Sequence, residues 1–188
     1  MENKVKPEIL PRHKGQALSY LKLTDADLAL VVNFGSSSLQ VERLPNFLRD
    51  KNPEFVWVPR PLQNDMIYPE LTNKVMQVCH RVHFVLGPGF LHQVYRRAVM
   101  VELSRCNIEY DYIKQMPVEY LDQLLGYEEP RVILVEDKVL LATIAYRVAD
   151  ANTMVSKLRS LLKRLGLKLG IVANFRGTKC SVTPVRIR

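Results

Sequence analysis

Hydrophobic residues in the middle of the chain recur at helical spacing. Over residues 72–85, valines occur every three or four positions, which predicts an amphipathic helix. Its buried face should consist of Val75, Val78, Val82 and Val85. Gly87-Pro88-Gly89 should end this helix, because proline has no backbone N–H and glycine tolerates positive φ. A second helix is expected directly afterwards, and its buried face should consist of Leu91, Val94, Ala98 and Val101 or Glu102.

Strand-like patterns follow these two helices. In residues 107–121 hydrophobic and polar positions alternate, which favours a strand. The strongest hairpin signal lies in residues 131–148, where two β-rich runs, Val132–Val135 and Val139–Ala145, flank the turn Glu136-Asp137-Lys138. We therefore expect a mixed sheet to pack against the central helices.

The two ends of the chain share one pattern. Residues 13–44 predict a helix to about Thr24, a strand, a Gly-Ser turn and a second strand. Residues 154–187 repeat this order, beginning with a helix that carries Leu158, Leu161, Leu162 and Leu165. Without a gap, Leu28 aligns with Leu169 and Asn33-Phe34 with Asn174-Phe175. An internal repeat is the better interpretation, and chance agreement of two amphipathic units is the alternative.

Prolines mark the segments between these units. The first dozen residues contain Pro7 and Pro11 and predict a mobile arm. Residues 45–64 are rich in proline, which prevents long regular structure and predicts a linker. Within it, residues 55–58 are expected to pack on the core as a short extended piece. The predicted organisation is a partial repeat in residues 1–44, this linker, and a complete α/β domain in residues 65–188.

Composition restricts the class of protein. The chain has 188 residues, 47% of them hydrophobic, which suits one globular domain with an appendage. No apolar run reaches the roughly 20 residues of a membrane helix, and the first residues lack a signal-peptide core. The cysteines are Cys79, Cys106 and Cys180, a scattered, odd set that suits free thiols. We expect a cytoplasmic location and no membrane partner.

The net charge of +8 is concentrated at one end of the chain. From residue 151 onward there is no Asp or Glu, although Lys and Arg are frequent. Such a stretch favours a polyanionic partner, DNA or RNA, and the alternative is an ordinary solvated helix face. The residues expected to contact nucleic acid lie on the exposed side of the last helix or just after it: Lys157, Lys163, Arg164 and Lys168.

Particular phrases in the sequence resemble a known family. The phrase from His83 through Gly89 to Tyr95, and Leu134-Val135-Glu136-Asp137-Lys138 in the hairpin, are similar to the GxxExxY proteins of the PD-(D/E)xK nuclease superfamily. Both terminal units are similar to that family's last helix and strand pair. The first unit keeps the family's Gln and Tyr as Gln16 and Tyr20, where the second has Lys157 and Leu161. The resemblance implies a restriction-endonuclease-like αβββαβ core with an extra N-terminal helix–strand–strand unit.

The resemblance also implies where catalysis would occur. Such nucleases hold Mg²⁺ with carboxylates from a helix and two strands, and a Lys two residues beyond the strand Glu assists. In this sequence those positions are occupied by His92, Val132, Ala142 and Ile144. Apolar side chains cannot ligate a hard cation or move a proton, so the resemblance implies a pseudoenzyme without a metal cofactor.

The sequence gives less support to other metal-binding or base-stacking residues. Glu129 would need a register shift to replace the missing Asp, and Glu136 with Asp137 would have to bind a metal alone. A zinc site built from Cys79, His80, His83 and His92 lacks a CxxC pair and convergent ligands. Base stacking is the functional alternative to core packing for four tyrosines, Tyr110, Tyr112, Tyr120 and Tyr127.

Three functions follow from these observations. The preferred hypothesis is an inactive nuclease-fold protein that binds nucleic acid or a protein partner. The second is a Mg²⁺-dependent nuclease with a rearranged site, to which Gln16 and Tyr20 contribute. The third is a structural or regulatory partner of an intact family member, or a homodimer formed by exchange of the N-terminal unit.

Overall fold

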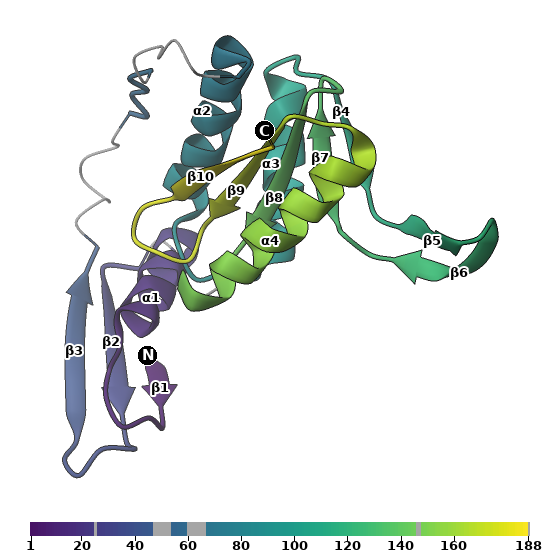
Figure 1. The fold of residues 1–188 in the computed structure, drawn as a ribbon. Coiled ribbons are helices and arrows are strands. Elements are labelled where there is room, and N and C mark those ends of the chain that lie inside the picture. Colours follow the sequence, from purple (N-terminus) through teal and green to yellow (C-terminus); the bar gives the residue numbers. More distant parts are fainter. Residues whose placement is uncertain (25, 47–53, 60–66, 146–147, 188) are drawn as a thin grey trace.

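A five-stranded mixed sheet forms the centre of the computed structural model, which describes residues 1–24, 26–46, 54–59, 67–145 and 148–187 (Figure 1). The strand order is β10-β9-β8-β7-β4, in which β8 and β9 are parallel and the other neighbours are antiparallel. The strands are β4 (Tyr110–Ile113), β7 (Val132–Val135), β8 (Val139–Ile144), β9 (Leu169–Asn174) and β10 (Ser181–Arg186). The predicted mixed sheet and its 132–145 hairpin are confirmed.

Helices cover both faces of this sheet, so its central strands are buried on both sides. The helices α2 (Pro69–Leu86) and α3 (His92–Arg105) pack on one face with Ile133, Leu141 and Ile171. The helix α4 (Val148–Leu165) covers the other face through Leu158, Leu161 and Leu162. The α3–β4–β7–β8–α4–β9 sequence gives the expected αβββαβ order.

The buried face of α3 differs from the predicted one. Leu91 and Val101 are exposed, whereas the buried residues are Tyr95, Arg96, Val99 and Leu103. Two stripes at helical spacing compete on this helix, and the one that contains the large ring of Tyr95 packs on the sheet. In α2 the prediction holds for three valines, but Val85 in the last turn is exposed.

The segment predicted as one strand, residues 107–121, forms parts of two sheets. After β4 the chain enters a separate hairpin of β5 (Met116–Tyr120) and β6 (Gln123–Glu128). This hairpin projects away from the main sheet (Figure 1). Both of its faces are largely exposed, which explains why simple alternation did not reveal the turn between its strands.

The N-terminal unit consists of a helix and a small sheet. Its elements are β1 (Glu2–Lys4), α1 (Pro11–Thr24), β2 (Leu28–Asn33) and β3 (Gln40–Pro45). The expected mobile arm is wrong for residues 2–4, because β1 pairs in parallel with β2. The Asn33 side chain also makes two hydrogen bonds with the backbone of Lys6. Its Oδ1 accepts from Lys6 N (2.9 Å), and its Nδ2 donates to Lys6 O (2.7 Å). These bonds hold the chain before Pro7.

The two terminal units have the same backbone register under a shift of 141 residues, from Leu28 to Leu169. Strand β2 pairs Leu28 with Pro45, and β9 pairs Leu169 with Arg186. The agreement extends to single hydrogen bonds. Phe34 N donates to Lys4 O (2.8 Å), as Phe175 N does to Ile144 O (2.9 Å). The two units therefore share their geometry, and common origin stays a prediction.

The N-terminal unit packs on its own chain at the turn between α2 and α3. A Cβ built on Gly89, whose φ is +114°, would lie 2.8 Å from the Gln16 Cα. On the other side, a Cβ at Gly15 would lie 3.1 Å from the Pro88 ring. The close approach of α1 to the turn therefore depends on both glycines.

The described part of the linker lies against α2. The ring of Phe55 is 5.6 Å from that of Phe84, and the ring of Trp57 is 5.3 Å from that of His80. Residues 54–59 have no regular secondary structure. Phe55 and Trp57 thus contact α2, whereas Val56 and Val58 are exposed, so the piece lies on the surface of α2. The rest of the predicted linker beyond residue 46 lies outside the described residues.

Candidate functional site

The phrase that carries the family resemblance builds a turn. Tyr95 Oη donates to Gly87 O (2.6 Å) and accepts the Phe90 N–H (3.2 Å), so it holds both sides of the turn before α3. Its ring stacks on Phe175 at 4.5 Å. Burial raises the pKa of the Tyr95 hydroxyl, which favours the neutral donor. His83 Nε2 lies 2.9 Å from Gly177 O. These residues fix where α3 begins and where His92 stands.

The three strand positions expected to hold carboxylates and a Lys are packed in the core. Val132, Ala142 and Ile144 are each 2% exposed or less, and all three belong to the apolar cluster beneath α4. None has a ligand atom for a cation. The residues present therefore do not fit the Mg²⁺ that the fold implies, and no catalytic step can be assigned to these positions.

A pocket of about 190 Å³ nevertheless lies beside these strands. Ala142 and Ile144 form its apolar floor, and the rest of the lining comes from α3, α4 and the segment before β7. Its polar and charged residues are His92, Arg96, Glu128, Glu129, Arg131, Thr143 and Lys157. The strand residues are packed, but long charged side chains from flanking elements surround the space above them.

The two carboxylates of this pocket are already paired. Arg131 bonds Glu129 through both Nε (3.0 Å) and Nη2, and Gln115 Nε2 donates to the same carboxylate (3.1 Å). The Arg131 hydrogen bond, more than any other contact, lowers the pKa of Glu129. Glu128 accepts from Arg164 Nη1 (3.3 Å). Glu129 therefore lies in a surface ion pair and does not replace the missing Asp.

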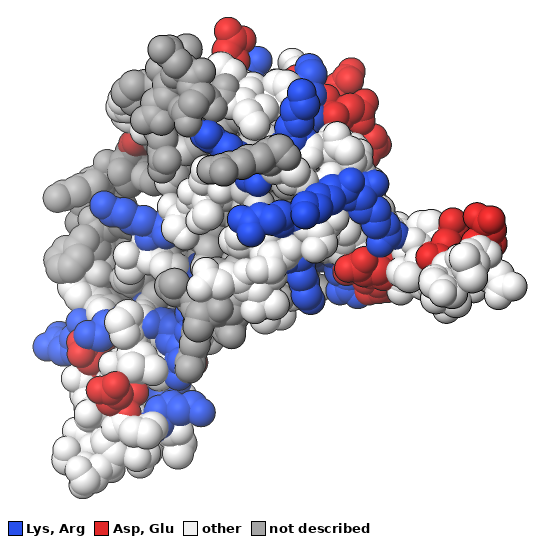
Figure 2. Space-filling model, viewed as in Figure 1, with Lys and Arg blue, Asp and Glu red and all other residues white. Residues whose placement is uncertain are grey.

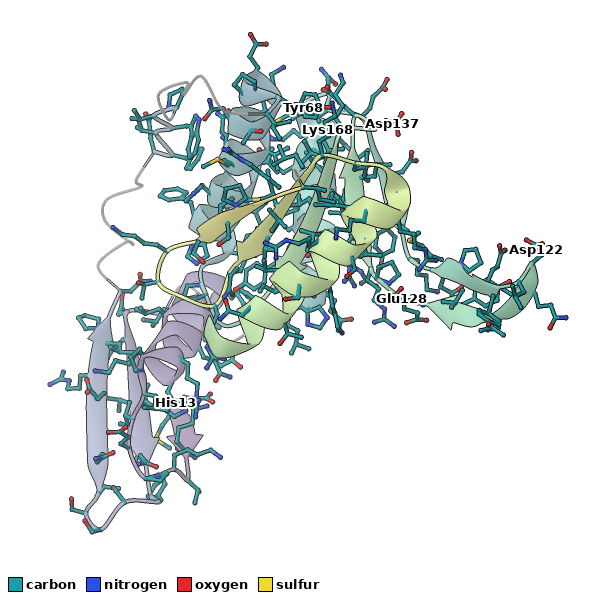
Figure 3. The ribbon with its side chains drawn as sticks, in the orientation of Figure 1. His13, Tyr68, Asp122, Glu128, Asp137 and Lys168 are labelled. Carbon is teal, nitrogen blue, oxygen red and sulfur yellow. The ribbon has the colours of Figure 1, made fainter. Side chains whose placement is uncertain are left out.

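The residues predicted to contact nucleic acid lie along α4 and just after it. Lys157, Lys163 and Lys168 are exposed, and Lys157 lines the 190 Å³ pocket. Figure 2 shows Lys and Arg gathered over α4. Lys168 lies at the same end of the sheet as Asp137, away from Glu128 (Figure 3). Arg164 is held against the projecting hairpin by Pro117 O and Glu128, so it has less freedom to meet a ligand.

The alternative metal sites find no support in the described residues. No group of three or more His, Cys, Asp or Glu side chains that could hold a metal occurs there. Cys79 is fully buried, whereas His80 faces Trp57. Glu136 and Asp137 lie in the β7–β8 turn, at the other end of β7 from the pocket (Figure 3).

Two of the four tyrosines are far from any core. Tyr120 and Tyr127 are exposed on the β5–β6 hairpin, although core packing was the preferred interpretation. Acidic side chains gather on the same hairpin (Figure 2), and Asp122 lies at its tip (Figure 3). Such a charge distribution opposes the approach of a phosphate backbone, so stacking on bases gains no support from it.

Sequence reasoning missed a polar group in the N-terminal unit. Glu2 and Lys4 on β1 stand where β8 has Ala142 and Ile144, because Glu2 and Lys4 pair with Val31 and Asn33 of β2, and Ala142 and Ile144 pair with the equivalent residues of β9, Val172 and Asn174. A carboxylate and a Lys two residues apart are the pair expected on the catalytic strand. The signal was Glu2-Asn3-Lys4 ahead of Gln16, but the preceding arm was assigned no structure.

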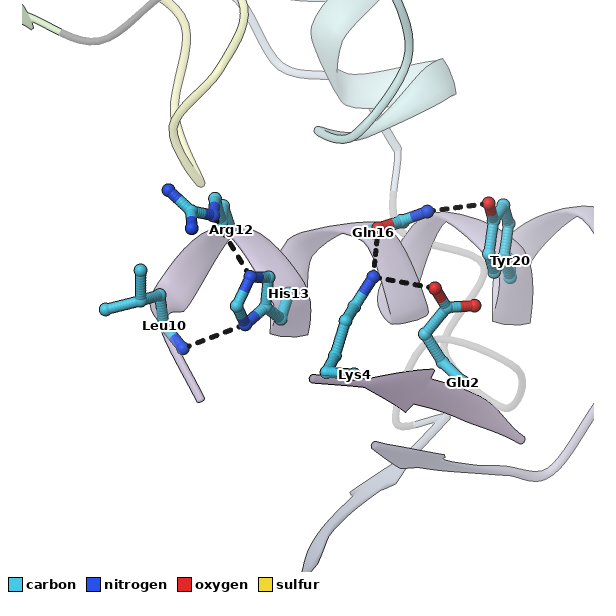
Figure 4. A network of polar contacts seen from close by, with 7 residues as sticks. All are labelled: Glu2, Lys4, Leu10, Arg12, His13, Gln16 and Tyr20. Atoms are coloured by element: carbon cyan, nitrogen blue, oxygen red, sulfur yellow. Dashed lines mark hydrogen bonds and ion pairs between the residues drawn. The ribbon is translucent and has the colours of Figure 1, made fainter. Parts of the chain in front are cut away.

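These side chains form a connected network (Figure 4). Lys4 Nζ lies 2.7 Å from Glu2 Oε1 and 2.9 Å from Gln16 Oε1, and Gln16 Nε2 donates to Tyr20 Oη (2.8 Å). Desolvation, followed by the charge of Arg12, lowers the pKa of the nearby His13. The first unit thus has a carboxylate and a Lys at the strand positions where the second has Ala142 and Ile144.

A second pocket, of about 320 Å³, lies at this network. Lys4 and Gln16 line it, and their equivalents Ile144 and Lys157 line the first pocket. The remaining cations of its lining are Lys6, Arg12 and Arg176. The two pockets therefore occupy corresponding places in the two terminal units, one with polar strand residues and one with apolar strand residues.

The architecture, a mixed sheet flanked by helices, is that of a restriction-endonuclease-like fold. The family model of the PD-(D/E)XK nuclease superfamily matches residues 1–44 and 69–187, and the chain belongs to this superfamily. No curated protein and no solved structure matches it. Among the described residues, no helix is long and apolar enough to cross a membrane.

Proposed function

We propose that this protein is a catalytically inactive member of its superfamily that binds nucleic acid through the phosphate backbone. The observation that carries this proposal is the burial of Val132, Ala142 and Ile144, the strand positions at which metal ligands are expected, in an apolar cluster. Without oxygen ligands on these strands, Mg²⁺ has no site there at which to activate water.

The charge along α4 supports binding. Exposed Lys157, Lys163 and Lys168 follow α4 and its end, and residues 152–187 contain no carboxylate side chain that would compete. Cations that neutralise phosphates release condensed counterions, which drives association without reading the sequence. Affinity for DNA or RNA should therefore fall steeply with salt.

Binding and cleavage should be measured together. Fluorescence anisotropy with single- and double-stranded oligonucleotides at low salt should show saturable binding of the wild type. Lys163→Glu should weaken it by about tenfold, since one phosphate contact becomes repulsive. Lys74→Glu, the same reversal at an exposed position on α2, should not change it. The absence of binding at low salt would remove the nucleic-acid proposal and leave a protein partner.

Cleavage tests the other half of the proposal. Plasmid and single-stranded DNA incubated with Mg²⁺ or Mn²⁺ should remain intact. Cleavage that EDTA abolishes, and that copurifies with the protein through a second column, would overturn the assignment as inactive.

A second candidate is a residual metal-dependent nuclease centred on the N-terminal unit. It is favoured by Glu2 and Lys4, which stand in register with the strand positions of the main domain and connect to Gln16. One carboxylate with water and substrate phosphate is a common environment for Mg²⁺. The shared register also supports descent of both units from one duplicated segment.

This candidate predicts a specific dependence on Glu2. Mn²⁺-dependent cleavage should disappear in Glu2→Gln and persist in Glu8→Gln, a matched substitution at an exposed neighbour. Cleavage that is equal in both variants, or absent from the wild type, would eliminate the N-terminal unit as the source of activity.

A further inference from the structure

The pocket beside the degenerate strands contains a buried cation without a carboxylate partner. Arg96 is only 8% exposed, and no carboxylate of the described residues lies within ion-pair distance of it. Its Nη1 is 3.5 Å from Arg131 O, and its Cζ lies 5.4 Å over the Tyr112 ring. A buried charge with so little compensation is unfavourable unless a ligand of opposite charge completes it.

A hydroxyl in the same lining also lacks a partner. Thr143 Oγ1 is the one buried side-chain oxygen or nitrogen of the described residues without a hydrogen bond. Thr143 is 5% exposed and lines the pocket with Arg96 and Lys157. Because buried polar groups are normally satisfied, this hydroxyl is an independent sign of a missing polar ligand.

The remaining features of the pocket favour an anion. The helix α3 begins at His92 with no side-chain cap and no acidic residue in its first turn, so its positive end is left for a ligand. Glu128 and Glu129 are each engaged by an arginine outside α3, Arg164 and Arg131. Among the described residues of the lining, the Lys and Arg side chains left without a carboxylate are thus Arg96 and Lys157.

We infer that this pocket binds a phosphate group through Arg96, Lys157 and the Thr143 hydroxyl, at the place where the fold would otherwise hold its metal. A guanidinium, an ammonium, a hydroxyl and a helix N-terminus together match the oxygens of one tetrahedral anion. The inference rests on the proposed function where the phosphate belongs to a nucleic-acid strand. A free phosphate or a nucleotide offers the same chemistry.

His92 provides a spectroscopic readout of this site. Desolvation, and then the charges of Arg96 and Arg131, lower the pKa of His92. A bound phosphate would offset those charges and favour the protonated imidazole. Its pKa should therefore rise when inorganic phosphate is added, and NMR titration of the His92 ring would measure this shift.

The test uses the full-length protein, inorganic phosphate and paired variants. Arg96→Gln should weaken phosphate binding by about tenfold or more, since a charge-assisted bond is lost. Arg97→Gln removes the same charge one residue away on the exposed side of α3 and should change nothing. Thr143→Val keeps the shape of the side chain and should weaken binding by about threefold.

The outcomes separate this inference from the proposed function. If phosphate raises the pKa of His92 and displaces a bound oligonucleotide, the pocket binds a phosphate of the nucleic-acid strand. If phosphate binds but the wild type and Arg96→Gln have equal affinity for the oligonucleotide, the pocket binds a small phosphorylated ligand instead. If His92 does not respond to phosphate, or Arg97→Gln binds as weakly as Arg96→Gln, the inference fails, even where nucleic acid still binds α4.

Discussion

Gly89 provides a direct test of how the N-terminal unit is held. Its φ of +114° is unfavourable for any residue with a side chain, and a Cβ there would lie 2.8 Å from Gln16 Cα. Since that contact is with the backbone of α1, rotating a side chain cannot relieve it. For Gly89→Ala we expect about 1–3 kcal/mol from backbone strain. Displacement of α1 should cost a further ~1–3 kcal/mol.

Urea unfolding should therefore show a loss of about 2–6 kcal/mol in the free energy of unfolding of Gly89→Ala. Gly166→Ala is the matched control, because its φ is +66° and no atom lies within 4 Å of the added Cβ. It should cost only the left-handed strain, about 1–2 kcal/mol. If Gly89→Ala is no less stable than Gly166→Ala, the contact between the turn and α1 does not exist.

Three further predictions address other parts of the chain. Tyr95→Phe removes a buried hydroxyl with two backbone partners and should lower the free energy of unfolding by about 1–3 kcal/mol; an unchanged urea midpoint would contradict its role in the turn. Arg164→Ala should speed amide exchange in residues 116–128, measured by mass spectrometry, because it releases Pro117 O and Glu128; unaltered exchange would show that the hairpin is held otherwise. Burial raises the pKa of Cys180 to about 12, so at pH 8 iodoacetamide should modify exposed Cys106 and spare Cys180 until the protein unfolds. In the folded state the Cys180 thiol keeps its proton up to about pH 12, whereas in the unfolded chain it releases it near pH 9.0. The contribution of this thiol to the free energy of unfolding is therefore fully present below pH 9 and is lost as the pH rises toward 12. Cys180→Ala should not show that loss.

Local sequence patterns predicted most of the helices and strands, but they did not predict which elements pair or pack with one another. The helices and the 132–145 hairpin followed from periodicity and turn residues, which act over a few positions. The three-residue β1 has no periodicity of its own and depends on the free edge of β2, 29 residues further along the chain. The choice of face on α3 likewise depended on the sheet, which preferred the ring of Tyr95 over the stripe that begins with Leu91.

The candidate site was likewise predicted only in part. The hairpin phrase ending at Lys138 was enough to locate Val132, Ala142 and Ile144, and their burial is observed. The charged lining could not be foreseen, because nothing in the sequence around Arg96 indicates that this arginine is buried without a carboxylate. Its environment is created by residues such as Tyr112 and Arg131, which lie 16 and 35 positions further along the chain.

The packing around the old strand positions has an evolutionary consequence. On the proposed descent from an active nuclease, recovery of the cage would require charged side chains at Val132, Ala142 and Ile144, each of which is buried among apolar neighbours. An unpaired charge in such a place costs several kcal/mol, and a domain has only about 5–15 kcal/mol of stability to lose. Every single reversion would therefore remove a large fraction of that stability before the others could restore a metal to pair with it. Repacking of this core therefore makes the loss of the metal site difficult to reverse. Selection can change what the pocket binds more readily than it can restore cleavage.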